Sequence, residues 1–81
     1  MTILTLYGKP GCHLCHEARA EIERVRAERP FDLEEIDVSL DPGLQREYGE
    51  RIPVVAIGGE DVLELRVRAE ELRRLLDTVP S

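Results

Sequence analysis

Two cysteines separated by two residues, Cys12 and Cys15, are the side chains best suited to chemistry in this 81-residue chain. They lie where a run of strand-forming residues gives way to a helical pattern, so Cys12 falls at the expected start of a helix. Unpaired backbone N–H groups and the positive end of the helix dipole favour a thiolate there. Cys15 lies one turn further on, where it can attack a mixed disulfide formed at Cys12. The spacing therefore predicts a dithiol–disulfide pair in which Cys12 attacks and Cys15 resolves.

Two cationic side chains lie close to this pair in the sequence. Lys9 belongs to the loop before Cys12, and His13 follows Cys12 directly. Each is interpreted either as a solvated surface residue or as a positive charge that stabilises the thiolate. We adopt the functional interpretation for Lys9. For His13, the candidate that would tune the thiolate, both interpretations stay open.

A structural cysteine pair, a zinc site and a haem site all agree less well with the residues around the two cysteines. Buried structural cysteines rarely fall at this spacing by chance. A zinc ion needs a tetrahedral set of ligands, whereas the cysteines and histidines of residues 12–16 lie within about one helical turn and have no second ligand pair downstream. The run Cys-His-Leu-Cys-His matches the c-type haem attachment pattern. Haem would also need an axial partner and an export signal, and the only methionine is the initiator. We therefore expect no metal and no bound organic cofactor.

Charge and hydropathy exclude several further classes of protein. The 17 acidic and 11 basic residues give a net charge of −6, and no basic run exceeds two residues, which argues against nucleic-acid binding. The longest apolar run covers residues 52–57, far short of the roughly 20 residues that cross a membrane. The first residues lack the basic region of a signal peptide. Two cysteines are also too few for a secreted disulfide scaffold. We therefore expect one cytoplasmic domain over residues 1–81.

The pattern of apolar and turn residues predicts seven elements. They are a strand over 3–7, a helix over 13–28, a strand over 31–37, a short helix over 42–48, strands over 53–57 and 62–67, and a helix over 69–79. A helix joins the first two strands, which should therefore be parallel, and a turn at Gly58-Gly59 makes the last two strands a hairpin. The expected fold class is α/β, in the order β-α-β-α-β-β-α, with a four-stranded mixed sheet and helices on its faces.

Three local details accompany this prediction. The charge of the second strand places it at a sheet edge. Asp41 and Gly49 are the expected N-cap and C′ residues of the short helix. The alternation of Leu63, Leu65 and Val67 predicts that these side chains share one face of the last strand. The last helix lacks a good N-cap residue, and the local sequence does not explain this.

Taken together, these motifs resemble those of a glutaredoxin within the thioredoxin superfamily, over essentially the whole chain. Tyr7-Gly8-Lys9-Pro10-Gly11-Cys12 is similar to the loop that leads into the glutaredoxin active site, and Cys12-x-x-Cys15 matches the active site itself. The chain looks most like small uncharacterised glutaredoxin-like proteins with a C-x-L-C site. The resemblance implies that Pro53 is the family's cis-proline, and that Ile52 and Pro53 shape the groove for the substrate.

One segment departs from the glutaredoxin pattern. Glutaredoxins usually carry Gly-Gly-x-Asp-Asp before the last helix, where it binds glutathione, but here the corresponding residues are Glu64-Leu65-Arg66-Val67-Arg68. Two arginines would repel the amine at the γ-glutamyl end of glutathione, although Lys9 and Arg51 are available for its glycine end. Losing a charge-assisted contact costs about 1.5–3 kcal/mol. We therefore expect weak coupling to glutathione as a co-substrate.

The function expected from these residues is thiol–disulfide oxidoreduction, with reduction of protein or small-molecule disulfides by the Cys12-His13-Leu14-Cys15 dithiol. A reductase of the thioredoxin-reductase type, or another dithiol, would supply the electrons. We expect a monomer that binds neither nucleic acid nor a membrane. The alternative is a thioredoxin-fold binding module whose cysteines form a redox latch without turnover.

Overall fold

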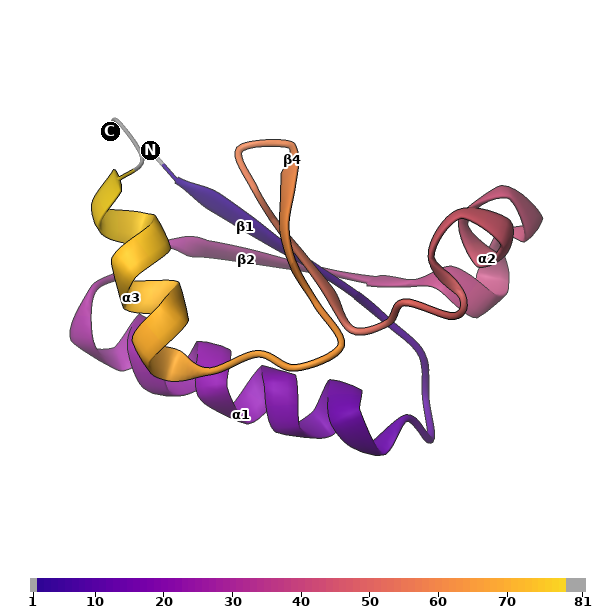
Figure 1. Cartoon of the computed structure of the whole chain (residues 1–81), viewed down its shortest axis with the longest axis horizontal. Helices are drawn as coiled ribbons and strands as arrows, with labels where there is room; N and C mark the ends of the chain where they lie inside the picture. The colour runs from indigo at the N-terminus through magenta and orange to yellow at the C-terminus, as the bar shows by residue number, and fades with distance from the viewer. Residues whose placement is uncertain (1, 79–81) are drawn as a thin grey trace.

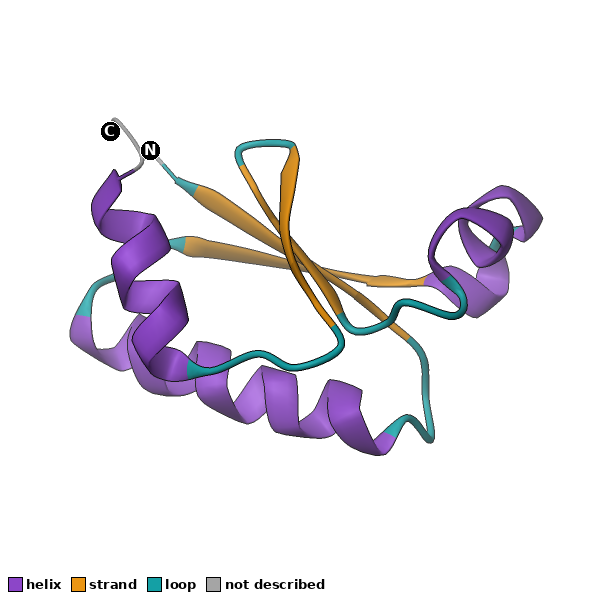
Figure 2. Cartoon of the chain, in the orientation of Figure 1, coloured by secondary structure: helices purple, strands orange, loops and turns teal. Residues whose placement is uncertain are grey.

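Residues 2–78 are described by a computed structural model, in which they form four strands, three α-helices and one short 3-10 helix (Figures 1 and 2). The elements are β1 (Ile3–Gly8), α1 (His13–Glu28), β2 (Asp32–Asp37), η1 (Val38–Leu40), α2 (Pro42–Tyr48), β3 (Val54–Ile57), β4 (Glu60–Glu64) and α3 (Ala69–Thr78). Their order and their mixed sheet are those of the fold class predicted from the sequence.

The strands form one sheet in the order β2-β1-β3-β4. β1 runs parallel to β2 and antiparallel to β3, and β3 pairs antiparallel with β4. The parallel pair and the hairpin were both predicted. β2 lies at an edge, as its charged residues indicated, while every residue of the central strand β3 is buried.

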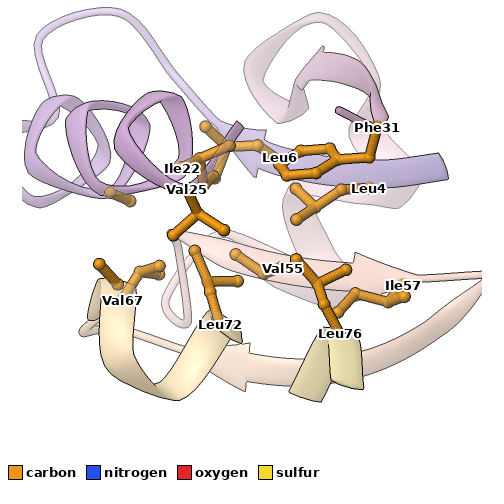
Figure 3. Packing of buried hydrophobic residues seen from close by; sticks show 12 residues of the cluster. Leu4, Leu6, Ile22, Val25, Phe31, Val55, Ile57, Val67, Leu72 and Leu76 are labelled. Atoms are coloured by element: carbon orange, nitrogen blue, oxygen red, sulfur yellow. The ribbon is translucent and has the colours of Figure 1, made fainter. Parts of the chain in front are cut away.

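The main core lies between the sheet and two helices. α1 and α3 lie on the same side of the strands, and Figure 3 shows their apolar side chains meeting those of β1 and β3. Buried residues in this cluster include Leu4, Leu6, Ile22, Val25, Val55, Ile57, Leu72 and Leu76. The helical spacing of Ala18, Ile22 and Val25 placed them correctly on the buried face of α1.

α2 lies beyond the end of β2, away from the other two helices (Figure 1). Asp41 caps it, since its carboxylate accepts hydrogen bonds from the backbone N–H groups of Gly43 at 2.8 Å and Leu44 at 3.2 Å. The helix ends at Gly49 as predicted, but Gly49 adopts a right-handed conformation rather than the left-handed one of a C′ glycine. Its lack of a side chain matters for space, because a Cβ atom there would collide with the carbonyl oxygen of Gln45.

The predicted bounds of the last strand are wrong. β4 covers Glu60–Glu64 rather than 62–67, because Gly58 and Gly59 both adopt positive φ angles, 60° and 87°, and form a two-residue turn. The pairing of β3 with β4 shifts register between Val55 and Ala56. Leu65 then leaves the sheet with a φ of 67°. Leu65 therefore does not share a strand face with Leu63, although Val67 still reaches the core.

The missing N-cap of α3 is supplied by α1. The Glu21 carboxylate accepts a hydrogen bond of 3.1 Å from the backbone N–H of Ala69, the first residue of α3. The two residues are 48 positions apart, so the sequence around Ala69 does not indicate this contact. The predicted end of α3 at Val79 lies outside the described residues. Within residues 2–78, no helix is long and apolar enough to span a bilayer.

Candidate active site

The two cysteines meet at the N-terminus of α1, where they are joined as a disulfide with their Cα atoms 5.2 Å apart. Cys12 is the N-cap residue and is half-buried, whereas Cys15 is only 6% exposed. The backbone N–H of Cys15 donates a hydrogen bond of 3.2 Å to Sγ of Cys12. The more accessible sulfur is therefore also the one that faces the unpaired N–H groups of the helix, which stabilise a thiolate.

Gly8, the last residue of β1, provides the space for Cys15. A Cβ atom at position 8 would lie 3.0 Å from Sγ and 3.3 Å from Cβ of Cys15. The sequence pattern indicates Gly8 only as part of the loop that leads to the cysteines. A glycine at the point where a strand turns toward a cysteine pair can indicate that a side chain packs closely against the backbone there, because such packing needs a residue without a side chain.

A small apolar cluster surrounds the disulfide on the side of α2. Its buried members are Cys15, Val38 and Ile52, and the partly buried residues packed against them are Tyr7, Cys12, Leu44 and Tyr48. Pro53 is fully buried next to Ile52, and the peptide bond between them is cis, the isomer that the resemblance implied. The structure thus brings Ile52 to the cysteine pair, with Pro53 as its neighbour in the chain.

Two tyrosines, for which the sequence predicts no role, stack beside this cluster. The rings of Tyr7 and Tyr48 lie 4.3 Å apart at an interplanar angle of 20°. Burial raises the pKa of the Tyr48 hydroxyl, and the nearby Asp61 carboxylate and Tyr7 add to the shift. Tyr48 therefore stays neutral across the physiological pH range. No pattern in the sequence connects two tyrosines so far apart.

Arg51 is held in place by its neighbours. Its guanidinium lies 5.2 Å from the centre of the Tyr48 ring, donates to Glu64 Oε2 at 3.1 Å, and donates twice to the backbone carbonyl of Glu47 at 3.3 and 3.2 Å. These contacts brace the segment that leads into Pro53. The substrate-binding role assigned to Arg51 stays a prediction, and these groups would compete with a ligand for its donors.

Lys9 and His13 both project from the surface near Cys12. The carbonyl of Lys9 accepts a hydrogen bond of 3.4 Å from the backbone N–H of Cys12, and the Lys9 side chain is exposed. The His13 imidazole is 90% exposed and lies 3.7 Å from a Glu17 carboxylate oxygen. Within residues 2–78, no hydrogen bond joins either side chain to Cys12. Their roles at the thiolate stay predictions.

A groove of about 290 Å³ runs beside the first turns of α1. One wall is formed by Leu14, Glu17 and Glu21 of α1, and the other by residues 65–68, which link β4 to α3. Backbone hydrogen bonds anchor this link, because the N–H of Leu65 donates to the carbonyl of Pro53 at 2.8 Å. The segment in which the sequence departs from glutaredoxins therefore lies against the helix of the cysteine pair. Among residues 2–78, no group of three or more His, Cys, Asp and Glu side chains is placed to hold a metal ion.

Comparison with known proteins shows relatives of this chain in both sequence and fold. The family model described as "Glutaredoxin-like domain (DUF836)" matches residues 3–77. The uncharacterized protein Rv0508 of Mycobacterium tuberculosis is 32% identical, over 94% of this chain and 89% of its own. The solved structure of protein XcR50 from X. campestris superposes with a TM-score of 0.82 and 31% identity, covering 95% of this chain and 99% of its own.

Two further solved structures extend the comparison. Protein Ne2328 from Nitrosomonas europaea has a TM-score of 0.78 and 26% identity, over 91% of this chain and 89% of its own. A mutant thioredoxin from Halobacterium salinarum has a TM-score of 0.71 at 23% identity, over 98% of this chain and 78% of its own. The likeness to thioredoxin concerns the fold alone.

Proposed function

Because the chain belongs to the glutaredoxin-like domain family (DUF836), we propose that it is a thiol–disulfide oxidoreductase that reduces protein or small-molecule disulfides through Cys12 and Cys15. The observation that carries the proposal is the unequal environment of the two sulfur atoms. Cys12 is half-buried at the helix N-terminus with a backbone N–H directed at its Sγ, while Cys15 is almost fully buried behind it. This is the arrangement that an attacking and a resolving cysteine require.

The reaction proceeds in two exchanges. The Cys12 thiolate attacks one sulfur of the substrate disulfide, which forms a Cys12–substrate disulfide and releases the other substrate sulfur to take up a proton. Cys15 gives up its proton and attacks Sγ of Cys12, which releases the second substrate thiol and closes the Cys12–Cys15 disulfide. Two electrons pass from the protein dithiol to the substrate. The disulfide form of the protein is the product of this half-reaction.

A second reaction must return the protein to its dithiol form. We propose that a thioredoxin-reductase-type flavoprotein or another dithiol supplies these two electrons better than glutathione does. Support comes from Arg66 and Arg68, which occupy the segment where glutaredoxins hold the amine of glutathione with acids. We place the activity in the cytoplasm, where thiols are kept reduced, and in a monomer. Efficient, saturable turnover with glutathione and glutathione reductase would overturn the proposed donor preference.

Reduction of insulin by catalytic amounts of the protein, with a chemical dithiol as donor, tests the proposed function. Wild-type protein should accelerate the reaction, and Cys12→Ser should abolish the acceleration because the accessible attacking sulfur is gone. His16→Ala, an exposed substitution on the same helix, serves as the control and should retain the activity. An oxidised protein that never turns over would instead indicate a binding module with a redox latch.

A further inference from the structure

Two guanidinium groups in the groove beside α1 have no carboxylate partner among the described residues. Most arginines of this acidic chain are paired with acids: Arg19 with Glu35, Arg24 with Glu21, Arg26 with Glu23, Arg29 with Asp77, Arg51 with Glu64, and Arg73 with Glu28. Arg66 and Arg68 are exposed, and within residues 2–78 their side chains form no ion pair or hydrogen bond. Both line the groove beside α1.

The acids on the opposite wall of the groove contact groups other than Arg66 and Arg68. Glu17 lies 3.7 Å from the His13 imidazole. Glu21 accepts the hydrogen bond from the N–H of Ala69 at 3.1 Å and lies 3.6 Å from Arg24. Neither carboxylate is paired with Arg66 or Arg68, so both guanidinium groups are available to a ligand.

Apolar surface accompanies these charges. Leu14 is half-buried on the α1 wall, and Leu65 is 45% exposed on the other wall. Leu65 has a φ of 67°, which is unusual for a residue other than glycine, and the N–H of Arg66 donates to the carbonyl of Glu64 at 2.8 Å across it. This tight turn, joined to Pro53 by the hydrogen bond from the N–H of Leu65, fixes the direction in which the link leaves β4.

We propose that this groove selects disulfide-containing proteins in which acidic and apolar residues flank the reacting cysteine. The proposal rests on the proposed function and names the substrate class of the same site. Arg66 and Arg68 would pair with the acidic residues, while Leu14 and Leu65 contact the apolar ones. The net charge of −6 opposes the approach of an acidic partner. Salt screens that repulsion beyond about 8 Å, whereas the contacts within the groove are shorter.

The test uses three synthetic peptides that carry the same disulfide and differ only in the pair of residues on each side of the reacting cysteine, which is Asp-Leu, Gln-Leu or Lys-Leu on both sides. Fully reduced protein is mixed with each peptide in a single turnover, so no electron donor is needed, and the appearance of peptide thiol gives the rate constant. Each rate constant is divided by that for dithiothreitol with the same peptide, which removes differences in the reactivity of the disulfides themselves.

Wild-type protein should react about tenfold faster with the acidic peptide than with the lysine peptide at about 0.15 M ionic strength, where the long-range repulsion from the net charge is screened and two exposed ion pairs replace two repulsions. The preference should shrink to less than about twofold in Arg66→Gln/Arg68→Gln and reverse in Arg66→Glu/Arg68→Glu. Rates with the glutamine peptide should stay unchanged, which shows that the variants fold and that their cysteines react. Arg74→Gln, which removes an exposed arginine of α3 that does not line the groove, should keep the full preference.

Equal normalised rates for the three peptides with wild-type protein would overturn the proposal while leaving the proposed function intact. A preference that survives in Arg66→Gln/Arg68→Gln would also overturn it. Glutathione disulfide serves as a fourth substrate. If it alone reacts faster with wild-type protein than with the glutamine variant, the groove binds glutathione rather than a polypeptide. Failure of wild-type protein to react with any of the four would overturn the proposed function itself.

Discussion

Cys12 and Cys15 are neighbours on one helical turn, yet different atoms surround their sulfurs. Cys12 caps α1 and accepts a backbone hydrogen bond, whereas Cys15 packs into the cluster of Val38 and Ile52 and lies against Gly8. The first environment favours a thiolate that reaches a partner. In the proposed exchange, the second would keep the other sulfur from reacting until a mixed disulfide forms beside it.

Replacing Gly8 by alanine should destabilise the reduced protein by about 1–3 kcal/mol, the usual cost of adding a methyl group to a filled site. The new Cβ would press on Sγ of Cys15 at 3.0 Å. Urea unfolding with a reductant present measures the cost. In a Cys15→Ala background most of the penalty should disappear, because Sγ is absent. An equal penalty in both backgrounds would show that Cys15 is not the group displaced.

The sequence predicted those features of the site that depend on neighbouring residues. The cysteine spacing placed Cys12 at the helix start, and Asp41-Pro42 marked the start of α2. Features that join distant segments were missed, including the stacking of Tyr7 on Tyr48 and the packing of Cys15 against Gly8. Such contacts depend on how elements pack, which local propensity does not encode.

At the scale of elements, the link between β4 and α3 decides how the site differs from the glutaredoxin pattern. The alternating apolar residues predicted a strand as far as Val67. The backbone N–H of Leu65 instead bonds to Pro53 and ends the strand early. The two-residue turn at Gly58-Gly59 and the register shift after Val55 move the hairpin so that residues 65–68 become a wall of the groove.

Glu21 connects this link to α1, which leads to a prediction about helix capping. Glu21→Ala should lower the free energy of unfolding by about 1 kcal/mol, the usual cost of losing an N-cap hydrogen bond. Glu21→Gln should lose much less, because an amide oxygen still accepts from the N–H of Ala69. Chemical denaturation of both variants measures the difference, with Glu17→Ala as the control one turn earlier on α1. Equal losses for the two Glu21 variants would contradict the capping role.

At the scale of the whole molecule, α1 and α3 pack together on one side of the sheet (Figure 2). Their apolar faces share the main core, and two ion pairs, Arg29–Asp77 and Arg73–Glu28, join them at the surface. The rest of the chain forms the sheet and a small separate cluster around the cysteines. The main core thus lies on one side of the sheet, and the two cysteines lie apart from it in the small cluster.

One of these ion pairs makes stability depend on pH. The hydrogen bond from Arg73 lowers the pKa of Glu28 below its ordinary value of 4.5. The pair therefore stabilises the fold above about pH 4.5, and this contribution disappears as the pH falls through the lower folded-state pKa. The midpoint temperature of thermal unfolding should be higher for wild-type protein than for Glu28→Gln at pH 7. This gap should close below about pH 4. A gap that is constant with pH would contradict this assignment. Arg74→Gln, on the same helix, should show no such trend.

The central claim is that Cys12 attacks disulfides and Cys15 resolves the product, and trapping the intermediate tests it most directly. Reduced Cys15→Ser protein, mixed with a disulfide peptide and analysed by mass spectrometry, should accumulate a peptide adduct on Cys12 because no second sulfur can release it. Cys12→Ser protein should form at least tenfold less adduct under the same conditions, since Cys15 is almost fully buried. Adducts that form equally fast on Cys15 alone, or that fail to form on Cys12, would contradict the account.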